Sequence, residues 1–453
     1  MSHRAKCIAA YGLLATMLGW LQLGSKDVWL DEAASAGFAL GPAASWIADH
    51  NMALYYALLG AWVRVFGHDP VALRSLSVAC FVASVPAFYC LAEALFSQSV
   101  ARSATALYVT NMLLVHLAQE ARGYMLAVLL VILSQLALVR LLARESWWSA
   151  VGLGVAQGLS VYAHLFAGLV ALAQIGVISI WAWSRPALPR WKLTAAYGLS
   201  AAIAAPLALQ ALRAGGAQVW WLYPPSLARS WGALVMWSGG SAVLAVAELA
   251  LCVVFVLREP GRALARPLVA AWLIVPIAVS FAISAWLVPI AHPKYLCVSV
   301  PALLLTAAAG LERIPTPGLR ITALVALLVL SSQRLHFWYA HYQKERWNEV
   351  ATWIATQQRP GDALVLDVEG AEAFDYSVEQ LGLSGRLPEP WTHGSRPNRV
   401  WVLQNRSREF DATKALPSYA ASWTRRFEPL DEDASSLFAD SSGRVIQLSL
   451  LQR

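Results

Sequence analysis

Long apolar runs separated by short polar segments occupy the first three quarters of the chain. A helix needs about 20 mostly apolar residues to cross the hydrocarbon core of a bilayer. The pattern therefore predicts a multi-span α-helical membrane protein with about 11 spans. We place these spans near residues 7–24, 73–96, 101–118, 123–140, 147–164, 165–183, 194–212, 234–257, 268–288, 295–311 and 320–338.

Two regions depart from this pattern. Residues 33–67 are apolar but carry Pro42, Asp49, His50 and Arg64, which favours helices at the membrane interface over another crossing. From about residue 339 the chain is polar, and its apolar spacing predicts a helix followed by buried strands. The helix is expected at 346–354 and the strands at 363–368, 399–403 and 444–448.

These patterns predict two domains. Residues 1–338 form a transmembrane domain whose first outer loop, 25–72, holds the interfacial helices. Residues 339–453 form a small extramembrane α/β domain, which we interpret as an acceptor-facing or stabilising module. Composition agrees, because only 13% of the residues are charged, whereas soluble domains carry about 25%. The five cysteines all precede residue 298, and none has metal-ligand spacing.

Basic residues orient the predicted spans. Arg4 and Lys6 precede the first span, and Lys and Arg favour the cytoplasmic side. With the N-terminus inside, the inner segments carry 13 basic residues and the outer segments before the tail carry 7. An odd number of spans then places the C-terminal domain outside, in the periplasm of a bacterium whose inner membrane holds the protein. The net charge of +7 is thus mainly a topology signal and requires no nucleic-acid partner.

An acidic pair follows the first span directly. Asp31 and Glu32 lie within Trp29-Leu30-Asp31-Glu32-Ala33, which this topology places on the outer face. A carboxylate there can accept a proton from a nucleophile. The same face carries the basic residues Arg74, Arg122 and Lys294, which could neutralise a phosphate. The chain has no Gly-rich phosphate loop, so a cytosolic nucleotide is not the expected substrate.

Five segments, in order along the chain, carry recognisable motifs. They are Trp29-Leu30-Asp31-Glu32-Ala33, Leu54-Tyr55-Tyr56 through Phe66-Gly67, Ala72-Leu73-Arg74-Ser75-Leu76-Ser77, Gln119-Glu120-Ala121-Arg122-Gly123-Tyr124 and His292-Pro293-Lys294-Tyr295. Together they resemble the motifs of polytopic glycosyltransferases of the GT-C fold, in the protein-mannosyltransferase and aminoarabinose-transferase branch (glycosyltransferase family 39-like). The resemblance covers about residues 25–311, and a Tyr-Ala-His at 162–164 is a weaker match.

The resemblance implies a reaction at the outer face. A sugar linked through phosphate to a polyprenol would be transferred to a hydroxyl of a glycan, a lipid or a protein, with membrane lipids around the enzyme. We assign Asp31 as the base, with Glu32 as the second catalytic carboxylate. Lys294 and Arg122, with Arg74, are expected to bind the donor phosphate. The supporting residues are Glu120, Tyr124, Tyr295 and His164. No cofactor is expected, and a divalent metal is compatible with the sequence but not required by it.

Two departures from the family pattern bear on the site. Met52-Ala53 stand where a Pro pair is common, so His50 and Asn51 receive little weight. Lys294 stands where Arg is commoner, and Lys offers a point charge in place of a bidentate fork. Each of these assignments has a structural alternative. Glu32, Glu120 and Arg122 could only hold their turns, Tyr124 and Tyr295 could be interfacial aromatic residues, and His164 could cap the end of a span.

Other functions stay open at this point. A lipid or sugar carrier without chemistry would also have many spans, and Glu248, inside a predicted span, would suit its proton relay. An O-antigen-ligase-like enzyme would use outer cations as well. The sequence names neither the sugar nor the acceptor.

Overall fold

A computed structural model describes residues 2–47, 51–184, 188–215, 219, 222, 224–258, 264–367, 371–392, 397–405, 420–427 and 446–452. The chain divides into two compact units. The first comprises residues 1–21, 38–65 and 74–336, and the second comprises 22–37, 66–73 and 337–453.

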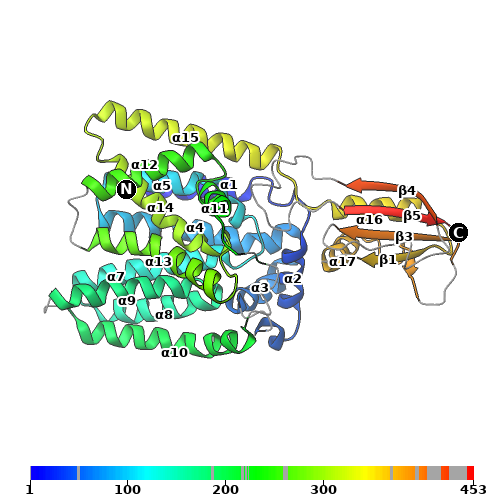
Figure 1. Ribbon diagram of the computed structural model, residues 1–453, viewed down its shortest axis with the longest axis horizontal. Helices are drawn as coiled ribbons and strands as arrows, with labels where there is room; N and C mark the ends of the chain where they lie inside the picture. Colours follow the sequence, from blue (N-terminus) through cyan, green and yellow to red (C-terminus); the bar gives the residue numbers. More distant parts are fainter. Residues whose placement is uncertain are drawn as a thin grey trace. The chain divides into compact units, whose positions relative to one another are not determined.

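The first unit is a helical bundle (Figure 1). In it α8 packs against both α7 and α10, while α14 packs against α12 and α5. Every residue of α14 is buried, so this helix lies at the centre of the core. The helices that belong wholly or mostly to this unit are α1 (His3–Trp20), α3 (Ala53–Phe66), α4 (Pro70–Leu95), α5 (Gln98–Thr110), α6 (Met112–Ala118), α7 (Tyr124–Arg144), α8 (Trp147–Ala163), α9 (Ala167–Ser184), α10 (Arg190–Ala214), α11 (Leu227–Trp237), α12 (Ala242–Arg258), α13 (Ala265–Trp286), α14 (Val300–Leu311) and α15 (Pro317–Ala340), with 3-10 turns η1 (Ala43–Ile47) and η3 (Tyr295–Ser299).

Breaks interrupt several predicted spans. Between α5 and α6, the Asn111 side chain accepts a hydrogen bond from the Leu114 amide and so caps α6. Between α11 and α12 the chain bends by 87°. Gly239 and Gly240 lie there at φ of +73° and +79°, a region that side chains with a Cβ rarely adopt. The predicted spans 101–118 and 234–257 are therefore each two helices.

The described helices are those of a membrane protein. Five are long and apolar enough to cross a membrane, and the bent α11–α12 pair gives a sixth if it counts as one span. Trp148, Trp183 and Trp286, near helix ends, are more than 80% exposed, which suits the aromatic belts at membrane interfaces. The number of crossings, 11 by hydropathy, stays a prediction. The five helices are α4, α7, α10, α13 and α15.

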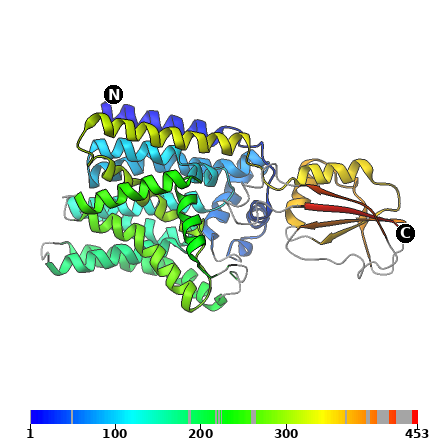
Figure 2. The ribbon, with the colours of Figure 1, turned by 45° about the horizontal axis from the view of Figure 1, so that its top comes forward.

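The second unit is built on a five-stranded mixed sheet in the order β2-β1-β3-β5-β4 (Figure 2). Strand β1 runs parallel to β2 and β3, whereas β5 runs antiparallel to β3 and β4. Trp401 and Leu403 of β3 pack with residues of α16 and α17, whereas the alternate Val400 and Val402 face a smaller cluster. The elements are α16 (Trp347–Gln357), β1 (Ala363–Asp367), α17 (Ala371–Gln380), β2 (Glu389–Pro390), β3 (Arg399–Asn405), β4 (Ala420–Phe427) and β5 (Ile446–Gln452).

The second unit also contains parts of the first outer loop. Residues 22–37 hold most of α2 (Leu30–Leu40), and 66–73 hold the start of α4. Val28 and Ala33 belong to the same apolar cluster as Trp347 of α16 and Phe374 of α17. From the sequence we expected the whole loop, residues 25–72, to belong to the membrane domain. In the structure, residues 22–37 and 66–73 belong to the same compact unit as the tail.

Candidate active site

The acidic pair lies in the first turn of α2, in the second unit. Asp31 is partly exposed, whereas Glu32 is fully buried. The Glu32 carboxylate accepts a hydrogen bond from the Lys344 ammonium at 2.7 Å, and both side chains are at most 1% exposed. A buried carboxylate needs such a partner because an unpaired charge in the interior is very unfavourable. Sequence reasoning missed Lys344, which lies 312 positions away.

In the first unit, hydrogen bonds of Arg122 join three sequence motifs. Its guanidinium donates a hydrogen bond to the Tyr56 hydroxyl at 3.1 Å. Its backbone carbonyl accepts one from Ser77 at 3.2 Å, and the Ser77 hydroxyl also bonds to Tyr55 at 2.9 Å. The Tyr-Tyr pair of α3, the start of α4 and the 119–124 turn are thereby joined. The turn itself is closed by the Arg122 amide, which donates to the Glu120 carbonyl.

Arg74 and Lys294 are buried in the same unit. Arg74 lies in α4 with 1% of its surface exposed. The Lys294 ammonium lies 3.2 Å from the Glu120 carboxylate, and the two side chains are 1% and 0% exposed. The same Glu120 oxygen lies 2.9 Å from Nε2 of His116, one helical turn earlier. His116 is a partner that the motifs did not include, although its i,i+4 spacing from Glu120 could have indicated it.

The remaining supporting residues form an aromatic cluster. The His164 ring lies between Tyr124, at 5.4 Å between ring centroids, and Tyr295, at 5.1 Å. His164 ends α8 in an extended conformation. Gly123 explains the close packing here, because a Cβ at that position would lie 2.6 Å from the Ala163 carbonyl oxygen. The sequence motifs around 119–124, 162–164 and 292–295 therefore meet.

The departures at Met52 and Asn51 are accommodated within this cluster. The Gly123 amide donates to the Met52 sulfur at 3.3 Å, and Met52 is fully buried. The Asn51 side chain accepts a hydrogen bond from the Leu165 amide at 3.2 Å. Asn51, given little weight from the sequence, thus joins the first outer loop to the segment after α8. His50 and Asp49 lie outside the described residues.

Glu248 has a local partner. It is 2% exposed in α12, and its carboxylate accepts a hydrogen bond from the Ser238 hydroxyl at 2.7 Å. Ser238 lies at the end of α11, next to the bend. Glu248 therefore ties the two halves of the bent pair together.

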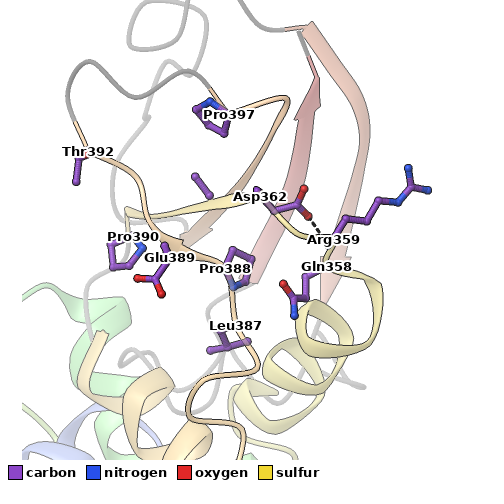
Figure 3. A pocket seen from close by; sticks show the side chains of 11 residues that line it. Gln358, Arg359, Asp362, Leu387, Pro388, Glu389, Pro390, Thr392 and Pro397 are labelled. Atoms are coloured by element: carbon purple, nitrogen blue, oxygen red, sulfur yellow. Dashed lines mark hydrogen bonds between the residues drawn. The ribbon is translucent and has the colours of Figure 1, made fainter.

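The second unit has a surface pocket of about 440 Å³ (Figure 3). Asp362 lines it, but both of its carboxylate oxygens are engaged. They accept hydrogen bonds from the Arg359 amide, from the Arg399 guanidinium at 2.6 and 2.9 Å, and from the Trp401 indole at 2.8 Å. Burial raises the pKa of the Asp362 carboxyl, but these hydrogen bonds outweigh burial and hold the pKa below its ordinary value. Asp362 is thus suited to holding the fold together and not to proton transfer.

Comparison with known proteins places these features in context. Residues 50–209 match the sequence model of the family described as dolichyl-phosphate-mannose-protein mannosyltransferase. No curated protein matches the chain. Within the described residues, no group of three or more His, Cys, Asp or Glu side chains is arranged to hold a metal ion.

Solved structures show the same fold over nearly the whole chain. ArnT from Cupriavidus metallidurans bound to undecaprenyl phosphate is 12% identical, with a TM-score of 0.61 and 99% of this chain and 98% of that chain covered. AglB from Archaeoglobus fulgidus, in complex with an inhibitory peptide and a dolichol-phosphate, is 11% identical, with a TM-score of 0.54 and coverage of 96% and 77%. The arabinofuranosyltransferase AftD from Mycobacteria is 14% identical, with a TM-score of 0.53 and coverage of 100% and 41%. The sequence match over residues 50–209 and the fold shared with ArnT, AglB and AftD make the chain similar to polytopic membrane glycosyltransferases of the GT-C type, which its motifs also resemble.

Proposed function

We propose that the protein transfers a sugar from a polyprenyl-phosphate donor to a hydroxyl acceptor on the outer face of a bacterial inner membrane. The observation that carries this proposal is the convergence of separate motifs on the buried cations Arg122 and Lys294. Buried cations suit a phosphate whose negative charge grows as it leaves. The lipid phosphates bound to ArnT and AglB support a donor of this class.

The reaction balances without a metal or a cofactor. The acceptor oxygen attacks the anomeric carbon of the sugar and forms the new glycosidic bond. The bond from that carbon to the phosphate oxygen breaks, and its electron pair leaves with polyprenyl phosphate. The hydroxyl proton passes to a carboxylate, which acts as general base.

Asp31 is the carboxylate that we assign as this base. Glu32 is its neighbour in the same helical turn, but Glu32 is fully buried and held by Lys344. A carboxylate that is committed to a buried ion pair is a poor proton acceptor, because protonation would leave the ammonium without its counter-charge. Asp31 is partly exposed. We therefore revise the role of Glu32 from proton transfer to holding the turn that bears Asp31.

Arg122 and Lys294 are assigned to the donor phosphate, with Arg74 as a third cation. Arg122 can hold two phosphate oxygens with its planar fork, whereas Lys294 supplies a point charge. Glu120 balances Lys294 in the absence of phosphate and orients its ammonium. The aromatic rings of Tyr124, Tyr295 and His164 are assigned to packing beside this charged cluster.

The acceptor is assigned only by chemistry, as a hydroxyl of a glycan, a lipid or a protein outside the cytoplasm. The test uses the purified protein with synthetic polyprenyl-phosphate sugars and extracts containing acceptors, and follows the release of polyprenyl phosphate. Release that depends on acceptor supports the proposal. Transport of the lipid across liposomes, with no release for any donor and acceptor tested, would replace it with the carrier function. Mass spectrometry of glycolipids and glycoproteins from cells with and without the gene would then identify the missing sugar.

A further inference from the structure

Three charged residues of the first outer loop contact residues 338–348, which comprise the end of α15, the link to α16 and the start of α16, all within the second unit. Glu32 pairs with Lys344 at 2.7 Å, with both side chains buried. The Asp27 carboxylate accepts two hydrogen bonds from Asn348, at 2.9 Å from the backbone amide and 2.8 Å from the side chain. The Lys26 ammonium lies 4.7 Å from the centre of the Trp338 ring. These contacts flank Asp31 on both sides in the sequence.

Each contact has a physical reason to be specific. The first amides of a helix have no partner within the helix, and Asp27 satisfies one at the start of α16, where a negative charge also suits the helix dipole. Lys26 is only 5% exposed, so its interaction with the electron-rich face of Trp338 replaces lost hydration. The pair of Glu32 with Lys344 excludes water, so neither charge tolerates loss of the other.

Apolar packing supports the same arrangement. Val28 and Ala33 are buried in the cluster that contains Trp347, Val350 and Ile354 of α16. The chain from Lys26 to Ala33 is therefore attached to the tail by side chains before and after Asp31. Asp31 itself stays partly exposed, as a group that meets a substrate must.

We propose that Lys344 is a positioning residue that acts through Glu32 on Asp31, so that residues 338–348 are part of the structure that holds the base. The catalytic part of this inference rests on the proposed function. The structural part does not, because it concerns only how the 26–33 segment is held. The tail domain is then required for transfer because it supplies this support.

The experiment compares Lys344→Met with Arg399→Gln in the full-length protein. Arg399 is the matched control, because it forms another buried ion pair within this unit, with Asp362 at 2.6 Å, and that pair involves no residue of the 26–33 segment. Hydrogen exchange of peptides covering 26–36 is measured together with kcat and the KM for donor. Lys344→Met should speed exchange of these peptides by about tenfold or more through local opening and lower kcat with little change in donor KM. Arg399→Gln should leave both quantities near wild type in the folded fraction.

Two further variants complete the test. Lys344→Arg should retain most of the turnover, because it keeps the positive charge. Glu32→Gln with Lys344→Met should exchange more slowly than Lys344→Met alone, because no buried charge is left unpaired. Equal effects of Lys344→Met and Arg399→Gln, or wild-type exchange in Lys344→Met, would overturn the positioning role. Wild-type turnover in Asp31→Asn would instead overturn the assignment of Asp31 as the base. This measurement involves no Lys344 variant, so the two failures can be told apart.

Discussion

Arg122 donates a hydrogen bond to the hydroxyl of Tyr56, which lies 66 positions earlier in the chain. Both residues are nearly or fully buried, and both come from motifs that the sequence analysis identified separately. This bond holds one guanidinium nitrogen of Arg122 in place and thereby fixes the orientation of the planar guanidinium group. The structure thus offers a way to test whether orientation of Arg122 matters as well as its charge.

Tyr56→Phe should lower transfer by about two- to tenfold, because removal of one net hydrogen bond typically changes free energy by about 0.5–1.5 kcal/mol. The loss should appear mainly as weaker use of the donor at low concentration. Tyr108→Phe is the matched control, since Tyr108 is equally buried and bonds to Ser84 at 2.6 Å. Steady-state kinetics with a synthetic donor measures both. Identical losses of activity in the two variants would show that the loss comes from removing any buried tyrosine hydroxyl and not from the orientation of Arg122.

Asp31→Asn should abolish transfer while leaving expression and membrane insertion intact. Asn keeps the size but cannot accept the proton, so turnover should fall by about 10²-fold or more, the usual scale for loss of a general base. Asp69→Asn serves as control, because Asp69 is a carboxylate of the same unit that caps α4 through the Val71 and Ala72 amides. Near-normal turnover of Asp31→Asn would remove Asp31 from this role.

Lys294→Ala and Arg122→Ala should each weaken capture of the donor or slow departure of the lipid phosphate. Truncating one partner of a buried charged contact typically costs about 2–5 kcal/mol. If both cations touch one phosphate, the double variant should lose less than the sum of the single losses. Lys294→Arg should keep much of the activity. Arg102→Ala, at an exposed position, is the control.

Full additivity of the two alanine variants would contradict a shared phosphate. Since Lys294→Ala also removes a buried positive charge beside the Glu120 carboxylate, Lys294→Ala with Glu120→Gln separates the two effects. A double variant that folds as well as wild type and still fails to use the donor assigns the loss to the missing cation.

The stability of the tail should fall as pH falls through the folded pKa of Asp362. The folded pKa is held below the unfolded value, so the stabilisation is fully present above the unfolded pKa and is lost on protonation. Hydrogen exchange of β3 peptides, corrected for the intrinsic effect of pH, should therefore reveal easier opening in acid than at neutrality. Asp362→Asn should be less stable at neutral pH and lose most of this dependence. A wild-type pH response in that variant would assign it to other groups.

The topology prediction is tested by single cysteines in a background without the native five. Ser384→Cys, in an exposed part of the tail, should react with an impermeant thiol reagent in cells whose outer membrane admits it. Thr316→Cys, exposed between α14 and α15, should react only after lysis. The reason is the basic asymmetry between the two sides of the membrane. The reverse pattern would overturn the orientation and the outer-face reaction together.

Local sequence patterns predicted much of the fold, because each element's own residues determine them. The strand at Ala363–Asp367 and the helix α16 begin within about one residue of the positions expected from apolar spacing. Breaks inside apolar runs were not predicted, because Asn111 and the Gly239-Gly240 pair leave mean hydropathy almost unchanged. The helix α17, at Ala371–Gln380, was missed because it is short and largely polar.

The motif residues of the first unit were predicted as a group, since each motif carries its own residue pattern, but their partners were not. His116 could have been identified from its i,i+4 spacing to Glu120, and Tyr56 from its place in the Leu54-Tyr55-Tyr56 motif. Lys344 could not, because its pairing with Glu32 depends on how the loop folds against the tail, and no local pattern encodes that.

The separation of Glu32 from Lys344 also bears on how the protein is made. The two residues are 312 positions apart, and a ribosome adds about 5–20 residues per second, so roughly 15–60 s pass between their synthesis. During that interval Glu32 has been synthesised but the Lys344 ammonium that pairs with it has not. Completion of this part of the protein must therefore wait until the last helix of the bundle has been synthesised. A chain that stops before residue 344 would lack Lys344 altogether. Premature termination late in the gene should therefore yield a protein that is inserted in the membrane but whose 26–33 segment lacks its buried ion pair.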